Sequence, residues 1–304
     1  LWKAGIEIPA MYKMGYNNNN CIGCVKGGMG YWNKIRKDFP EGGMFVLGAN
    51  LETPDEFRVV ADAGPLGLGG SAAHGHADAL SFTLSVAGRE FLVDPGTGTY
   101  HGPQAWRDGF RGTAMHNTLC IDGHDQAVSG GKFMWVRKYR STVIERGGNR
   151  VLDKLVAEHD GYKRLPGKPA HRRSWELDKL GDVLVVRDEI SGSRAQLVAL
   201  NWHFSEECSV TCTPDGLLVA NGPVNLESVL PPNGEVSLLR GSAMSELVLL
   251  REVAGRRTNA FAIPIEQLPL GVDVLVHEVV LLVVTLLEFL ARLVEEVAII
   301  HIAL

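Results

Sequence analysis

The stretch "LSFTLSVAGREFLVDPG", residues 80–96, alternates apolar side chains with small or polar ones on both sides of a short turn. Successive side chains of a strand point to opposite faces, so this alternation predicts two half-buried strands. Between them "SVAGRE" is expected to make the turn, with Gly88 supplying the positive φ. Residues 80–96 are therefore predicted to form a β-hairpin.

Similar segments recur through the centre of the chain. Runs such as "FRVVADAG", "NTLCIDG", "DVLVVRDEI" and "LVALNWHF" alternate with Gly, Pro and Asp turns from residue 43 to about 265. Turn signals spaced about 8–12 residues apart are typical of an antiparallel sandwich. The chain has 304 residues, 45% of them hydrophobic, which is enough for a large core. The expected fold class is mainly β, with a β-sandwich of antiparallel strands over residues 42–270.

The two ends of the chain differ from this centre. Residues 1–41 are rich in Asn, Gly and Lys and are expected to form a short irregular segment. In residues 271–304 four charged residues follow helical spacing and form one polar stripe: Glu288, Arg292, Glu295 and Glu296. We expect an amphipathic α-helical tail there that packs back on the chain or mediates self-association. Its longest uncharged run, Val279–Leu287, is too short for a membrane span.

The net charge of −5 is unevenly distributed. Residues 132–187 hold 14 Lys and Arg against 7 Asp and Glu, so this stretch carries +7 and the rest of the chain −12. A basic stretch in an acidic chain can attract a polyanion, and solvated strand faces produce the same count.

The segment "HGHAD", residues 74–78, places two histidines two positions apart. If the segment is extended, His74 and His76 project from the same face. Asp94 ends a strand, and His116 stands at the start of another. Imidazoles together with a carboxylate match the ligands of zinc. Three interpretations stay open at this point: a metal site, a catalytic base beside a metal, and a buried polar cluster without chemistry.

Three motifs together resemble the C-terminal β-sandwich region of the heparinase II/III-like proteins. They are "HGHAD" (74–78), "VDPGTGTY" (93–100) and "RGTAMHNTLCIDGHDQ" (111–126). The likeness covers roughly residues 43–265. Proteins of this family are polysaccharide lyases and their relatives, which act on uronic-acid-containing chains.

The resemblance carries roles over to individual residues. It implies that His74 lines the cleft and assists proton abstraction or neutralises the uronate carboxylate. It implies a zinc site, more structural than catalytic, with the ligands His76, Asp94 and His116. Its candidate substrate contacts are Arg111, Asn117 and Tyr100.

The chemistry of a lyase explains these residue types. The enzyme removes the proton α to a uronate carboxyl group and expels the 4-linked oxygen. This needs a base of moderate pKa, a donor for the carboxylate and an acid for the leaving group. Histidine can serve as such a base near neutral pH.

The resemblance also implies a missing part. In such lyases an α-helical toroid precedes the sandwich and supplies a tyrosine acid/base, whereas only about forty residues precede the match here. The expected function is β-elimination on a heparin-like, heparan-like or alginate-like polymer, incomplete without a toroid. The alternative is a non-catalytic module that binds acidic polysaccharide through the Lys and Arg of residues 132–187. Neither function involves nucleic acid or a membrane, and the family implies a periplasmic or secreted location.

Five cysteines at irregular spacing predict no disulfide framework. Cys21 and Cys24 form a CxxC pair, which is typical of half a metal site or a redox pair. Residues 6–41 resemble the C-terminal end of phosphoadenosine-phosphosulfate-reductase-like proteins, without their nucleotide-binding domain. We therefore expect a reductase-like remnant, and a thiol-dependent function stays as a third hypothesis.

Overall fold

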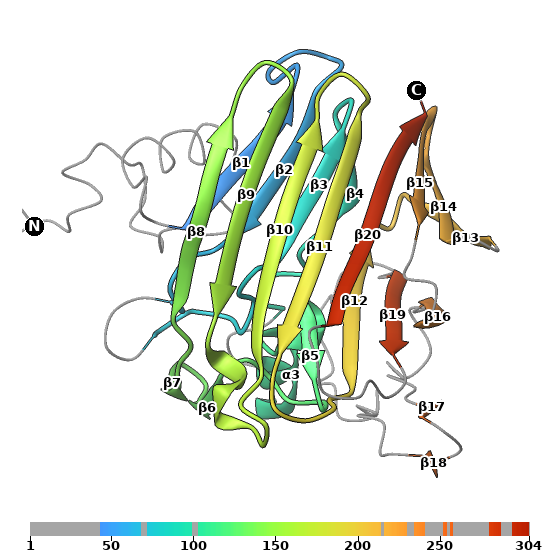
Figure 1. Ribbon diagram of the computed structural model, residues 1–304. Coiled ribbons are helices and arrows are strands. Elements are labelled where there is room, and N and C mark those ends of the chain that lie inside the picture. The colour runs from blue at the N-terminus through green and yellow to red at the C-terminus, as the bar shows by residue number, and fades with distance from the viewer. Residues whose placement is uncertain are drawn as a thin grey trace, which may run out of the picture.

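The computed structural model describes residues 43–67, 72–98, 103–213, 216–229, 234–240, 252–253, 256–257, 280–286 and 294–303. The predicted mainly β class is confirmed. Two eight-stranded sheets stack face to face, and every strand pair in them is antiparallel. In Figure 1 the sheet that contains β8 to β11 lies in front of the sheet that contains β1 to β4.

The elements have the following bounds. The first sheet runs β1 (Met44–Ala49), β2 (Phe57–Asp62), β3 (Phe82–Val86), β4 (Arg89–Leu92), β12 (Val198–Phe204), β19 (Val280–Leu286) and β16 (Gly234–Arg240), and β5 (Leu119–Ile121) also pairs with β12. The second runs β13 (Ser209–Thr213), β14 (Gly216–Asn221), β15 (Val224–Val229), β20 (Val294–Ala303), β11 (Val183–Ser191), β10 (Ala170–Asp178), β9 (Leu152–His159) and β8 (Ser141–Gly148). Smaller elements are the hairpins β6 (Val128–Gly131) with β7 (Met134–Arg137) and β17 (Glu252–Val253) with β18 (Arg256–Arg257), and the short helices α3 (Gln104–Phe110), η2 (Thr113–Met115) and η3 (Gly161–Arg164).

The predicted hairpin of residues 80–96 is confirmed as β3 and β4. Its two turn residues, Ala87 and Gly88, both have positive φ, at 49° and 73°. This combination is typical of a type I′ turn, whose twist matches that of the flanking strands. The glycine therefore has the role that the sequence predicted for it.

The core lies between the two sheets. Strands β10 and β11 bury every second side chain, as a half-buried strand must. Trp175 of β10 packs edge-on against Phe82 of β3, with 6.4 Å between ring centroids. Both side chains are almost fully buried, as is Trp202 of β12. Aromatic rings from both sheets thus fill the space between them.

The predicted α-helical tail is wrong for the part of residues 271–304 that the structure describes. Two strands are found there, β19 and β20. β19 pairs with β12 and β16, and β20 pairs with β11 and β15. β19 is rich in Val and β20 in Val and Ile, and these β-branched residues favour strands. Backbone partners on two sides outweigh the helical spacing of a few charges, so the tail completes both sheets instead of forming a helix.

The other predictions for the ends fall outside the described residues. They concern the Cys21–Cys24 pair and the reductase-like segment of residues 1–41. The domain boundaries at residues 42 and 271 stay predictions. Among the described residues, none of the helices has the length and apolar character that crossing a membrane requires.

A buried polar network ties the second sheet together. The Arg173 guanidinium donates to both carboxylate oxygens of Asp188, at 2.6 and 2.9 Å. His171 donates from Nε2 to the same carboxylate at 2.6 Å and accepts at Nδ1 from His159, 3.1 Å away. At the end of this series of hydrogen bonds, the Gly161 N–H donates to Nδ1 of His159. Both imidazoles are therefore neutral, with the proton on Nε2 in each.

Three fully buried histidines make the stability depend on pH. Burial lowers the pKa of His159 and His171, and it lowers the pKa of His203 to about 4. In the unfolded chain they titrate near 6.5. Below that pH the unfolded chain binds protons that the folded protein does not, so stability falls as pH falls.

Between pH 7 and pH 6 we expect the free energy of unfolding to fall by roughly 0.7 kcal/mol more in the wild type than in His203→Gln, because the folded pKa of His203 is about 4 and glutamine does not titrate. The other shifted groups, among them Asp62 and Asp78, whose pKa values burial raises, are common to both proteins and cancel in this comparison. Urea denaturation at the two pH values, with a chelator present, measures the change. An equal fall in both proteins would contradict a neutral, buried His203.

Candidate metal and catalytic site

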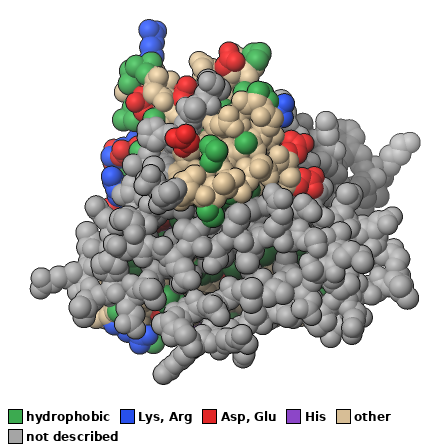
Figure 2. Space-filling model, turned by 90° about the vertical axis from the view of Figure 1, so that its right-hand side faces the viewer, with side chains coloured by type: hydrophobic (Ala, Val, Ile, Leu, Met, Phe, Trp, Pro, Cys, Tyr) green, Lys and Arg blue, Asp and Glu red, His purple; other side chains and the backbone are tan. Residues whose placement is uncertain are grey.

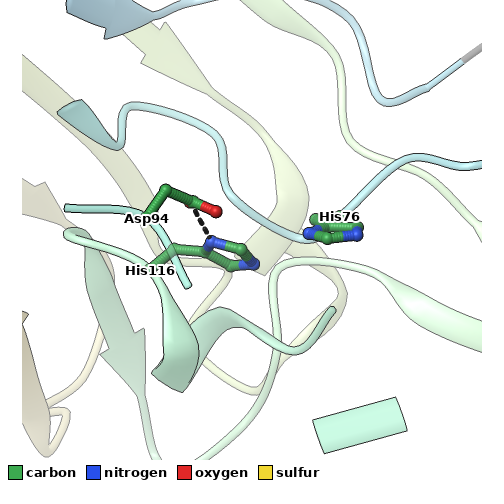
Figure 3. A group of neighbouring side chains, drawn as sticks. All are labelled: His76, Asp94 and His116. Carbon is green, nitrogen blue, oxygen red and sulfur yellow. Dashed lines mark hydrogen bonds and ion pairs between the residues drawn. The ribbon is translucent and has the colours of Figure 1, made fainter. Parts of the chain in front are cut away.

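Three loops at one end of the sandwich bring His76, Asp94 and His116 together. His76 lies in the loop before β3, Asp94 follows β4, and His116 directly follows η2. One ligand atom from each residue lies within 4.8 Å of those of the other two. In Figure 3 the Asp94 carboxylate and the His116 ring meet, and the His76 ring lies across from that pair.

Hydrogen bonds hold Asp94 and His116 in place. One Asp94 oxygen accepts from Nδ1 of His116 at 2.6 Å, and the other accepts from the Gly96 N–H at 2.8 Å. Nε2 of His116 is buried and has no hydrogen-bond partner among the described residues. The His76 and His116 ring centroids are 5.2 Å apart, and Nε2 of His76 lies 3.4 Å from the Thr97 hydroxyl.

In this cluster His116 and Asp94 are charged at pH 7, whereas His76 is neutral. Burial opposes a charge on His116, but the charge and hydrogen bond of Asp94 outweigh it and raise the pKa of His116 to about 9. Burial likewise works against ionised Asp94, yet His116 holds the pKa of Asp94 well below its usual range. Burial and the neighbouring His116 charge lower the pKa of His76 to about 3. His76 is thus neutral at pH 7, with a lone pair available for a ligand.

The donor set fits zinc. Two imidazoles and one carboxylate are common zinc ligands. Nε2 of His116 is buried and has no hydrogen-bond partner among the described residues, which leaves this nitrogen for a metal ion. Separations up to 4.8 Å are somewhat wider than the roughly 3.4 Å between neighbouring ligands of a tetrahedral zinc. Small side-chain movements would close that gap.

His74 does not share a face with His76, contrary to the expectation for an extended segment. It has φ 62°, in the left-handed region, so the chain turns between the two histidines. The His74 side chain is exposed and its ring centroid lies 5.7 Å from that of Phe133, whereas His76 turns toward Asp94. The turn needs Gly75, because a Cβ there would lie 2.7 Å from the backbone of Gly67.

Arg111 and Asn117, two of the expected substrate contacts, have protein partners. The Arg111 side chain is 1% exposed and donates to Asp108 and to the carbonyl groups of Gly131 and Lys132. This gives Arg111 a structural role, whereas its contact with a sugar stays a prediction.

Asn117 joins several strands. Its amide nitrogen donates to the carbonyl groups of Phe82 and Val93, and its oxygen accepts from the His203 N–H at 2.7 Å. Asn117, which follows His116, is therefore bonded to Val93, which precedes Asp94. Its contact with a sugar also stays a prediction, and Tyr100 lies outside the described residues.

Two further buried residues lie near the site. Tyr139, which is buried, donates to Asp78 at 3.3 Å, and burial raises the pKa of Asp78 to about 6. The indole nitrogen of Trp135 donates to the Gly75 carbonyl at 2.9 Å. A tyrosine or tryptophan in a strand pattern is usually a core residue, so only the structure identifies these contacts.

Comparison with known proteins agrees with the fold. The family model described as "Heparinase II/III-like, C-terminal" matches residues 33–260. The heparin-sulfate lyase of Pedobacter heparinus is 28% identical over 137 residues, which cover 44% of this chain and 18% of that protein. The match begins at residue 33, upstream of the boundary expected at residue 42.

Solved structures share the fold. The heparan sulfate lyase from Pedobacter heparinus superposes with a TM-score of 0.61 at 18% identity, over 86% of this chain and 35% of that one. A heparinase III structure gives a TM-score of 0.61 at 18% identity, over 86% and 36%. The chain thus spans about a third of these solved proteins and less than a fifth of the curated relative.

Proposed function

Because the chain belongs to the heparinase II/III-like family, through the C-terminal domain of that family, we propose that it is the sandwich part of a polysaccharide lyase. Its substrate would be a uronic-acid polysaccharide of heparin, heparan or alginate type. The observation that carries the proposal is that the exposed His74 lies two residues before His76, which belongs to the partly buried His76–Asp94–His116 cluster.

The proposed reaction is a β-elimination. His74 takes the proton on the carbon α to the uronate carboxyl group, the bond to the 4-linked oxygen breaks, and a carbon–carbon double bond forms in the ring. The leaving oxygen takes a proton from an acid. We propose that this acid comes from a helical toroid, since the chain spans about a third of its solved relatives. A periplasmic or secreted location would match such substrates.

We further propose that His76, Asp94 and His116 bind one zinc ion. When bound, zinc supplies positive charge that orders the three loops from which these ligands come. His116 and Asp94 already hold each other at 2.6 Å, so these residues pre-arrange two of the loops. Through His76, the site then holds the loop that carries His74 two residues earlier.

Metal analysis tests the zinc proposal. We expect one zinc per chain in the purified protein and at least about 100-fold weaker binding in His76→Ala, because three protein ligands fall to two. His124→Ala is the control, since His124 is exposed and outside the cluster. Equal zinc content in His76→Ala and the control, or no zinc in the wild type, would contradict the site.

A second candidate function is binding without cleavage. A cavity of about 220 Å³ is lined by Arg137, Lys138 and Arg164 together with Asp160, and this favours an anionic ligand. By contrast, Figure 2 shows the face on the β13–β15 side, where acidic, basic and apolar side chains of the described residues are interspersed. The basic side chains of the cavity fall within residues 132–187, the basic stretch of the sequence.

Incubation with heparan sulfate and with alginate, in the presence of a helical toroid domain that supplies the acid, separates the two functions. A lyase produces unsaturated uronate, seen as ultraviolet absorbance that increases with time and depends on His74. A binding module retains the polymer without such absorbance. A protein that neither cleaves nor retains acidic polymers would contradict both.

A further inference from the structure

The loop of residues 72–78 holds a conformation that needs external support. Ala72 and His74 both have positive φ, at 52° and 62°. Residues other than glycine seldom adopt this region, and they persist there only where surrounding contacts determine it. The Gly75 N–H donates to the Ala72 carbonyl at 3.1 Å, and the Ala77 N–H donates to the Arg111 carbonyl at 2.8 Å. These backbone bonds leave the Gly75 carbonyl for another donor.

Trp135 supplies that donor. Its indole Nε1 donates to the Gly75 carbonyl at 2.9 Å, and its side chain is only 3% exposed. Gly75 is the single residue between His74 and His76, so this hydrogen bond acts at the point where the two histidines diverge. The bond crosses from β7 to the loop before β3.

The hairpin of β6 and β7 is itself fixed. The Arg111 guanidinium lies 4.5 Å from the centre of the Trp135 ring and donates to the carbonyl groups of Gly131 and Lys132. Phe133, in the same hairpin, contacts the His74 ring. Trp135 therefore presents its N–H from a rigid, buried position.

We propose that Trp135 is a positioning residue for the two histidines. Its N–H fixes the Gly75 carbonyl, which keeps the backbone of His74 left-handed. His74 then faces outward while His76 turns toward Asp94. This inference rests on the proposed function for its catalytic consequence, but its structural part stands independently of it.

Two tryptophan-to-phenylalanine variants test the proposal. Trp135→Phe removes the N–H and keeps an aromatic ring. Trp175→Phe is the matched control, because Trp175 is equally buried and its Nε1 has no hydrogen-bond partner among the described residues. Hydrogen exchange of the Gly75 and Ala77 amides should become about tenfold faster in Trp135→Phe, as expected for one lost hydrogen bond, and stay unchanged in the control.

Kinetics provide the second measurement. In Trp135→Phe we expect kcat to fall about tenfold with KM unchanged, while Trp175→Phe keeps the wild-type kcat at a temperature where both are folded. Loop exchange equal in the two variants would overturn the proposal. Faster exchange with unchanged kcat would overturn its catalytic part. If the wild type forms no product even when a helical toroid domain is supplied, the lyase function fails, and the exchange measurement still decides the positioning role.

Discussion

Replacement of His74 by asparagine is expected to slow polysaccharide cleavage by about 10²- to 10⁴-fold, the range for loss of a general base. Asparagine suits this test because it adopts the left-handed backbone region of His74 more readily than most residues. The loop of residues 72–78 should therefore keep its shape. The rate of unsaturated-product formation at saturating substrate measures the effect.

His74 is a better candidate base than its neighbour. His76 is held by the cluster, and burial lowers its pKa to about 3, too low for a base at neutral pH. His74 is exposed, so a polymer can reach it.

The control for His74→Asn is His124→Asn, another exposed histidine. Zinc content should be the same in both variants. A wild-type rate in His74→Asn would exclude His74 as the base, whereas a joint loss of rate and zinc would indicate a damaged loop.

The fold was predictable where its signal is local. The alternation in residues 80–96 contains both strand faces and the turn, so β3 and β4 follow from the sequence alone. The grouping of His76, Asp94 and His116 came from the family resemblance, and the structure brings the three side chains together.

The features that the sequence did not predict depend on distant partners. Residues 280–286 and 294–303 become strands because β11 and β12 have backbone groups to pair, which the tail's own sequence does not reveal. The direction of His74 depends on Gly67 and Trp135, which approach Gly75 from other segments. Short-range periodicity does not contain this information.

Replacement of Arg173 by methionine is expected to lower the free energy of unfolding by about 3–5 kcal/mol, the usual cost of leaving a buried charge without its partner. Arg173 is fully buried, and its guanidinium binds Asp188 through two nitrogens. Burial opposes ionised Asp188, but the Arg173 charge outweighs it and holds the pKa of Asp188 at about 2. Without the arginine, this carboxylate keeps only the neutral His171 as a partner.

The neighbouring residue of the same strand provides the control. Arg172 is 44% exposed and pairs with Glu158 at 2.9 Å on the other face of β10, so Arg172→Met should cost less than about 1 kcal/mol. Urea denaturation at pH 7 compares the two variants. Equal losses of stability would show that the buried pair contributes no more than a surface pair.

Arg173 also connects the second sheet to the site. Its NH1 donates at 2.7 Å to the carbonyl groups of Leu80 and Asn117. Leu80 lies in the loop before β3, and Asn117 directly follows His116. Arg173→Met should therefore weaken zinc binding even where the protein is still folded, and Arg172→Met should not. Unchanged zinc affinity in folded Arg173→Met would limit this arginine to a role in stability.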